Sequence, residues 1–209
     1  RLRSVARVAD LAAQIAKPNA REIKEARGKI RWLSRAEAKR LAKALPAYWQ
    51  DVFRLQVATG LRPSEVVTLK RGDFSKTLDR LTLSRLDHLT LKTGSRTIHV
   101  PTKVRPIIRS RLNGGGDVLF ADPATEAAWT PIEKYEERFR EALKAAAKKA
   151  KIKTKVDTRI GRRTCASLLL RARKSADEVA ELLGNTPEMV RDHYGRLLPQ
   201  EIDPRKAAI

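Results

Sequence analysis

One tyrosine near the end of the chain stands among basic residues. The segment "LLGNTPEMVRDHYGRL" breaks a helical pattern at a glycine, restarts at Thr-Pro-Glu and brings Tyr194 close to arginines. A phenol can act as a nucleophile, but its pKa of about 10 requires a proton acceptor or nearby cations to activate it. The alternative is that Tyr194 packs against Val190, one helical turn earlier, and completes a small core.

Three other places carry cations that could act on a phosphate. In "ATGLRPSEVVTL", Arg62 precedes a predicted helix start, where its guanidinium and backbone N–H groups can converge on a phosphate. In "LKTGSRTIHV", Lys92 is predicted to lie on a hairpin, from which it could enter a nucleic-acid groove and supply a proton. In "DTRIGRRTCASLLL", Arg159 and Arg162 share one side of a helical turn. The plainer interpretations are a solvated arginine, an exposed turn charge and a basic helix start that touches DNA phosphates.

The composition narrows the class of partner. The 209 residues include 45 Lys plus Arg and 24 Asp plus Glu, a formal net charge of +21. Such an excess favours a polyanion, with nucleic acid first and an anionic membrane second. The single Cys165 excludes an internal disulfide and a cysteine-built zinc site. No signal-peptide pattern and no membrane-spanning apolar run is present, so we expect a cytoplasmic, nucleoid-associated protein.

The hydrophobic pattern predicts a mostly α-helical chain with one small antiparallel sheet, an α+β fold. Ser34 with Glu37, and Ser175 with Glu178, have the spacing of capping boxes, and Gly60 is placed to end a helix. Strands are predicted in "RLTLS", "DHLTLK" and "RTIHV". Helices are predicted over 2–16, 34–45, 46–60, 63–69, 103–112, 130–150, 163–172, 176–183 and 187–194.

In order and spacing, these segments resemble the catalytic domain of the tyrosine recombinase (phage integrase) family. The matching stretches are "TGLRPSEVVTLK", "LKTGSRTIHVP", "RIGRRTCASLL" and "LLGNTPEMVRDHYGRL". The resemblance implies a catalytic domain over 31–209, preceded at 1–30 by the end of a core-DNA-binding domain and a linker. Because the chain begins at Arg1 and its only methionine is Met189, we also expect further domains upstream.

The resemblance implies a role for each residue that matches the family pattern. Tyr194 would be the nucleophile, and Arg62 and Arg162 would hold the non-bridging oxygens of the scissile phosphate. Lys92 would protonate the departing 5′ oxygen. Glu65 matches the acidic residue that accompanies the first arginine as a support.

Two further site positions depart from the family pattern. Arg159 falls where the family usually has His or Lys, and Asn185 falls where it usually has His or Trp. Near neutral pH a guanidinium stays charged and an amide neither gains nor loses a proton, although both donate hydrogen bonds. These two residues would therefore position the phosphate without transferring protons.

The implied function is site-specific DNA recombination, as in integration by a phage or another mobile element. A homo-tetramer on double-stranded DNA would break and rejoin strands through a 3′-phosphotyrosine, with no cofactor, metal, membrane or small-molecule substrate. One alternative is a type IB topoisomerase-like strand transferase, with one subunit on one duplex. The other is a catalytically weak or non-catalytic basic DNA-binding domain.

The basic segment between 134 and 155 provides a first test of DNA binding. If it faces the duplex, the logarithm of DNA affinity should fall with the logarithm of salt concentration, by about 0.9 per phosphate contact. Neutralising Lys144, Lys148 and Lys151 together should flatten that slope, measured by fluorescence anisotropy. An unchanged slope would show that this face is only solvated.

Overall fold

The computed structural model describes residues 30–84 and 95–198. The chain divides into two units, Arg1–Ile30 and Arg31–Ile209. The predicted helix over 2–16, the predicted strand "DHLTLK" and Lys92 lie outside the described residues. The assignment of the first 30 residues to a core-DNA-binding domain therefore stays a prediction.

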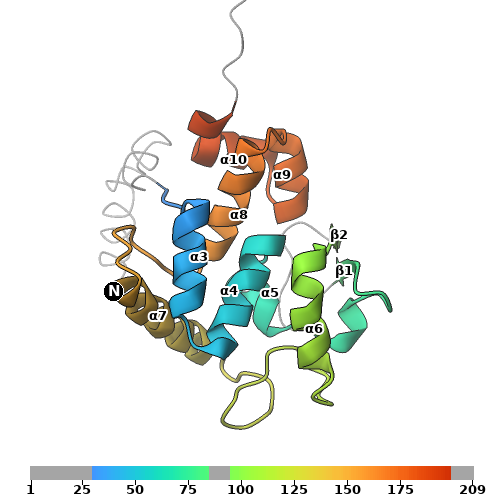
Figure 1. Ribbon diagram of the computed structural model, residues 1–209. Helices are drawn as coiled ribbons and strands as arrows, with labels where there is room; N and C mark the ends of the chain where they lie inside the picture. Colours follow the sequence, from blue (N-terminus) through green and yellow to red (C-terminus); the bar gives the residue numbers. More distant parts are fainter. Residues whose placement is uncertain (1–29, 85–94, 199–209) are drawn as a thin grey trace, which may run out of the picture. The chain divides into compact units, whose positions relative to one another are not determined.

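The described residues of the second unit are mostly helical with one two-stranded sheet, which confirms the predicted fold class (Figure 1). Strands β1 (Arg80–Leu83) and β2 (Arg96–His99) pair antiparallel, so that Leu81 lies opposite Ile98 and Leu83 opposite Arg96. The helices are α3 (Arg35–Ala44), α4 (Ala47–Thr59), α5 (Pro63–Val67), α6 (Arg105–Leu112), α7 (Ile132–Lys149), α8 (Ile160–Arg171), α9 (Ala176–Leu183) and α10 (Pro187–Tyr194). Short 3-10 helices occur at η1 (Arg71–Asp73), η2 (Thr102–Val104) and η3 (Gly195–Leu197).

Helix α4 packs closely against α8, and this pair holds the two arginine segments in place. The buried Gln56 of α4 donates from Nε2 to the carbonyl of Leu61, at 3.5 Å, and to that of Thr158, at 3.2 Å. Leu61 directly precedes Arg62, and Thr158 lies in the turn before α8. One amide side chain therefore ties together two segments about 100 residues apart in sequence.

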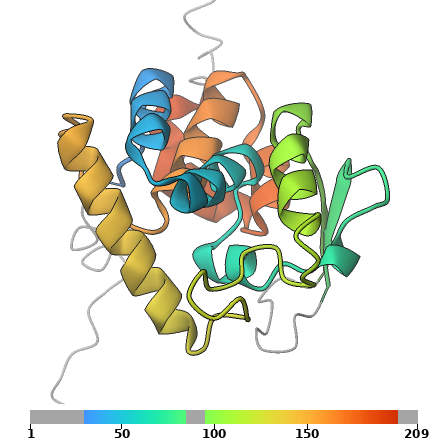
Figure 2. The ribbon, with the colours of Figure 1, turned by 60° about the horizontal axis from the view of Figure 1, so that its bottom comes forward.

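Helix α7 runs along one flank of the unit, with the sheet and α6 at the other (Figure 2). It is amphipathic: Tyr135, Phe139 and Leu143 are fully buried, whereas Lys144 and Lys148 are exposed. These two lysines are therefore free to meet a polyanion from solvent. Within the described ranges, no helix is both long and apolar enough to span a bilayer.

The predicted helix ends are confirmed where local chemistry sets them. Ser34 and Glu37 form a capping box at α3, and Ser175 and Glu178 form one at α9. Gly60 ends α4 in the left-handed region, with φ of 71°.

The predicted start of α8 was wrong by three residues: the helix begins at Ile160, not Arg163. The carbonyl of Asp157 accepts from the N–H of Ile160, and its carboxylate accepts from the N–H of Arg159 at 2.9 Å. Asp157 thus satisfies the N–H group of Arg159 with its side chain and that of Ile160 with its backbone, which sets the helix start. Arg162 therefore lies in the first turn of α8.

Close packing of α4 on α8 can be tested with Gly161→Ala. An added Cβ would lie 2.7 Å from Cβ of Gln56, so one helix must shift. We expect a loss of about 1 to 3 kcal/mol in the free energy of unfolding, as overpacking typically causes, measured by urea denaturation. The control is Gly72→Ala, whose Cβ meets nothing within 4 Å. Since alanine favours a helix over glycine by about 1 kcal/mol, an unchanged or raised stability would contradict the close contact.

Candidate active site

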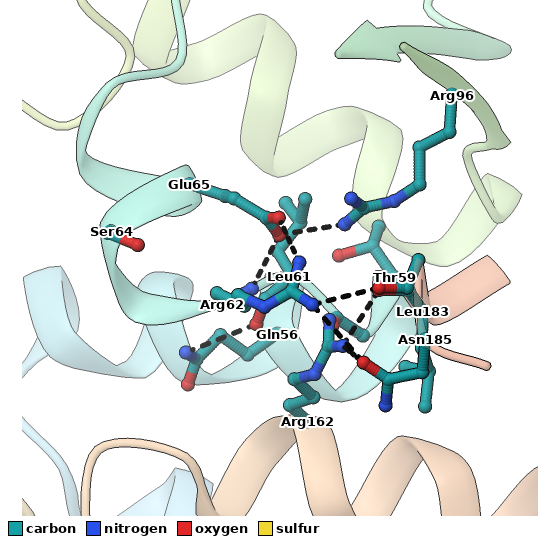
Figure 3. Close-up of polar contacts among 12 residues, drawn as sticks. Gln56, Thr59, Leu61, Arg62, Ser64, Glu65, Arg96, Arg162, Leu183 and Asn185 are labelled. Carbon is teal, nitrogen blue, oxygen red and sulfur yellow. Dashed lines mark hydrogen bonds and ion pairs between the residues drawn. The ribbon is translucent and has the colours of Figure 1, made fainter. Parts of the chain in front are cut away.

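Arg62 and Arg162 converge on one amide oxygen (Figure 3). Arg62 is the N-cap residue of α5, and Arg162 belongs to α8. The Nη2 atom of each donates to Oδ1 of Asn185, at 3.2 Å for Arg62 and 2.9 Å for Arg162. Three of the site residues predicted from the sequence therefore meet, although they come from three separate segments.

Backbone carbonyls at two helix ends hold the guanidinium groups. Arg162 donates to the carbonyls of Gly60 and Leu183, each at 2.7 Å, and Arg62 donates to that of Gly184 at 2.9 Å. These carbonyls belong to the C-termini of α4 and α9, where the last turn lacks helical partners and carries partial negative charge. Two like charges are thus held together by the negative ends of two helices.

Glu65 is the carboxylate of the site, and only 2% of its side chain is exposed. It accepts from the backbone N–H of Arg62 at 2.7 Å and from Nη1 of Arg62 at 2.8 Å. It also accepts from Nη2 of Arg96 at 2.8 Å. Burial raises the pKa of Glu65, but the hydrogen bond and charge of Arg96, together with Arg62, outweigh it and lower the pKa. Glu65 is therefore ionised and holds Arg62 through two hydrogen bonds. This contact agrees with the supporting role that the resemblance implies for Glu65.

The charge balance of the cluster favours an anion. Burial first, and then the charges of Arg62 and Arg96, lower the pKa of Arg162 to about 10, while Glu65 acts in the opposite direction. Arg162 is only 7% exposed, whereas 32% of the Arg62 side chain is exposed. An anion that approached from solvent would meet Arg62 first and would relieve the repulsion among the guanidinium groups.

Asn185 acts as an acceptor toward both arginines. A guanidinium only donates hydrogen bonds, so the amide must turn its oxygen toward the two Nη2 atoms. Its Nδ2 group is left to donate elsewhere. Asn185, which departs from the family pattern, therefore bridges Arg62 and Arg162 through its amide oxygen.

Tyr194 is buried at the end of α10 and is only 4% exposed. Its ring lies 5.7 Å from that of Trp32, measured between centroids. Burial raises the pKa of the phenol to about 12, against the opposing charges of Arg163 and Arg162. In the described part of the chain, no hydrogen bond joins Tyr194 to Arg62 or Arg162. In this arrangement Tyr194 packs in the protein interior, as the alternative interpretation of its sequence position predicted.

Of the two remaining predicted residues, the structure describes Arg159 alone. Arg159 is exposed at the N-cap position of α8, and its backbone N–H donates to Asp157. Asp157 also pairs with the side chain of Arg163. Lys92 lies outside the described residues. Among the residues that are described, no group of three or more His, Cys, Asp or Glu side chains could hold a metal ion.

Arg96 is a site residue that the sequence reasoning missed. Its side chain is only 9% exposed, and it points from β2 toward Glu65 (Figure 3). The alternating pattern of the strand could have revealed it. Side chains two residues apart lie on the same face of a strand, so Arg96 shares its face with the buried Ile98 and Val100. A charged residue on the apolar face of a strand calls for a buried partner.

The burial of the tyrosines can be tested by absorbance titration. Burial raises the pKa of Tyr48 and Tyr194 to about 12 and that of Tyr135 well above 10. The native protein should therefore form little phenolate at about pH 10.5, whereas the denatured chain should titrate near its ordinary pKa of about 10. In this range the unfolded chain binds fewer protons than the native one, so these groups make stability fall as pH rises.

Trp32→Ala should uncover Tyr194 and produce one phenolate near the ordinary pKa. The matched control is the Trp32→Ala, Tyr194→Phe double variant, in which that new signal should be lost. If Trp32→Ala leaves the native titration unchanged, Trp32 does not cover the phenol.

Comparisons with known proteins place the chain in a family. The phage integrase family matches residues 31–201, while no curated protein matches the chain. XerA recombinase shares the fold with a TM-score of 0.65 at 20% identity, over 86% of this chain and 64% of that one. The catalytic domain of bacteriophage HP1 integrase gives 0.61 at 18% identity, over 86% and 95%. The Tn1549 transposon integrase in complex with circular intermediate DNA gives 0.65 at 16% identity, over 95% and 67%. The chain thus spans less than two thirds of XerA, and with the family matched across most of its length, it belongs to the phage integrase family.

Proposed function

We propose that this chain is the catalytic part of a site-specific DNA recombinase of integrase type. The observation that carries the proposal is the convergence of Arg62 and Arg162 on one amide oxygen. A phosphodiester presents two non-bridging oxygens, and two guanidinium groups match them without a change of protonation. The net charge of +21 and family membership support double-stranded DNA as the polyanion.

In the proposed reaction, the phenol of Tyr194 gives up its proton to solvent and its oxygen attacks the scissile phosphorus. The bond from phosphorus to the 5′ oxygen breaks, and Lys92 supplies the proton that the departing oxygen needs. The product is a 3′-phosphotyrosine and a free 5′-hydroxyl. Because the new covalent bond conserves the energy of the broken one, a 5′-hydroxyl can attack it and rejoin the strand without a cofactor.

The other polar residues of the site would hold the phosphate during this exchange. Asn185 would donate from Nδ2 while its oxygen keeps both arginines in place. Arg159, exposed at the start of α8, would donate to the phosphate without exchanging a proton. Arg62 and Arg162 would stabilise the negative charge that grows on the equatorial oxygens as the phenol attacks.

Tyr194 must leave its buried place before it can attack. In the described arrangement, burial beside Trp32 and a pKa of about 12 make it a poor nucleophile. DNA binding would therefore have to shift α10 or the ring of Trp32. The same burial favours the second candidate, a weak or non-catalytic DNA-binding domain.

The remaining parts of the proposal concern the whole protein. Residues 1–30 would be the end of a core-DNA-binding domain with its linker. Four copies would act on two duplexes, in the cytoplasm of a bacterial host, in the service of a phage or another mobile element.

Covalent trapping separates the two candidates. A DNA site is first selected from random duplexes by binding, and a nicked version of it then lets the cleaved strand diffuse away. The parent should form a covalent protein–DNA complex, and Tyr194→Phe, which removes one oxygen, should bind equally well and form none. Mass spectrometry of the digested complex should find the nucleotide on Tyr194.

A nucleotide on Tyr48 or Tyr135 would end the assignment of the nucleophile. A parent that binds its selected site tightly but never forms a covalent complex would establish the DNA-binding candidate instead.

A further inference from the structure

Glu65 presents an electrostatic problem for an anion-binding site. Its carboxylate fixes both the backbone and the guanidinium of Arg62. The same negative charge, almost fully buried, cancels one of the two positive charges that Arg62 and Arg162 offer. A buried carboxylate beside the anion site would therefore weaken the binding that it organises.

Arg96, which lies on strand β2, offsets the negative charge of Glu65. It reaches Oε2 of Glu65 from β2, at 2.8 Å, whereas the guanidinium of Arg62 contacts Oε1 (Figure 3). Three guanidinium groups and one carboxylate leave the cluster a formal net charge of +2. Without Arg96, the same cluster would carry +1.

The buried state of Arg96 shows that this ion pair is its main contact. Only 9% of the side chain is exposed, and its Nε and Nη1 are buried without a hydrogen-bond partner in the described part of the chain. A buried donor without a hydrogen-bond partner costs free energy of folding. If Arg96 only filled space, an apolar side chain of similar size would give a more stable fold. The effect of Arg96 is also felt beyond Glu65, since its charge helps to lower the pKa of Arg162.

We infer that Arg96 is a positioning residue that compensates the charge of Glu65. It lets Glu65 fix Arg62 while Arg62 and Arg162 keep their full positive charge toward the phosphate. This inference rests on the proposed function for the identity of the anion. We expect Arg96 itself to make no contact with DNA, because only 9% of its side chain is exposed and its Nε and Nη1 are buried.

The test compares single-turnover covalent complex formation at saturating DNA in the parent and four variants. Arg96→Met lowers the cluster to +1 and should slow the reaction by about 100-fold, the size of loss that follows when one electrostatic contribution to transition-state stabilisation is removed. Arg96→Lys keeps the charge but loses the guanidinium fork, and should recover part of the rate. The matched control is Arg80→Met on the neighbouring strand β1, where the arginine is exposed.

The decisive variant is the double change Glu65→Gln with Arg96→Met. It restores the formal charge of +2, because both partners of the ion pair become neutral. If Arg96 compensates charge, the double variant should react faster than Arg96→Met alone. A double variant as slow as Arg96→Met, or slower, overturns the inference.

DNA affinity gives a second discrimination. Arg96→Met should leave the dissociation constant for DNA within about threefold and its salt slope unchanged, because a DNA duplex is held through many phosphate contacts, of which the Arg96 side chain makes none of its own. A slope reduced by about 0.9 would make Arg96 a direct phosphate ligand and would overturn the positioning role.

A third measurement does not require cleavage. Inorganic sulfate, compared with chloride at equal ionic strength, should raise the Tm of the parent and of Arg80→Met, and should raise that of Arg96→Met much less. An equal rise in Arg96→Met, or no rise in the parent, overturns the inference. A sulfate effect that depends on Arg96, in a parent that cleaves no DNA, sustains the inference and defeats the proposed function.

Discussion

The site depends on holding two guanidinium groups together against their mutual repulsion. Arg62 and Arg162 are partly or wholly withdrawn from water, where like charges repel strongly, and the pKa of Arg162 falls to about 10 in consequence. The opposing attraction comes from the carboxylate of Glu65 and from backbone carbonyls at the C-termini of α4 and α9. The carbonyls at these helix ends lack partners within their own helices, and they accept the hydrogen bonds that hold the two guanidinium groups.

This arrangement explains why the fold brings four separate segments to one place. Helix α4 supplies a carbonyl through Gly60 and an amide through Gln56, which ties the approach to Arg62 to the turn before α8. Helix α9 ends at Gly184 in the left-handed region and delivers Asn185 between the arginines. The sheet adds Arg96 through Glu65. Most of these contacts join residues far apart in sequence, and together they orient the guanidinium groups of Arg62, Arg96 and Arg162.

The arginine cluster is already arranged to bind an anion, whereas the proposed nucleophile, Tyr194, is not arranged to react. The arginines already have their hydrogen bonds, so little reorganisation would accompany binding of a phosphate. Tyr194 is instead buried, with its pKa raised to about 12. A pre-organised anion site beside a covered nucleophile would permit DNA to bind before the covalent step becomes available, which suits a reaction that must wait for its substrate.

Local sequence chemistry was enough to predict much of the fold. The capping boxes at Ser34 and Ser175 and the helix end at Gly60 depend on side chains within a few residues, so the pattern alone revealed them. The start of α8 was misplaced because it follows from a hydrogen-bonded turn at Asp157, three residues before the helix, which the hydrophobic pattern does not record.

By itself, the sequence determined the mostly helical class, the small sheet and the net positive charge, because these follow from periodicity and composition, and its four motifs carried the resemblance to the family. Tertiary structure alone decided that Asn185 bridges two arginines, that Arg96 shares Glu65 and that Tyr194 lies buried beside Trp32. These contacts join residues far apart in the chain. Their geometry depends on how helices end and pack in space, which no local pattern records.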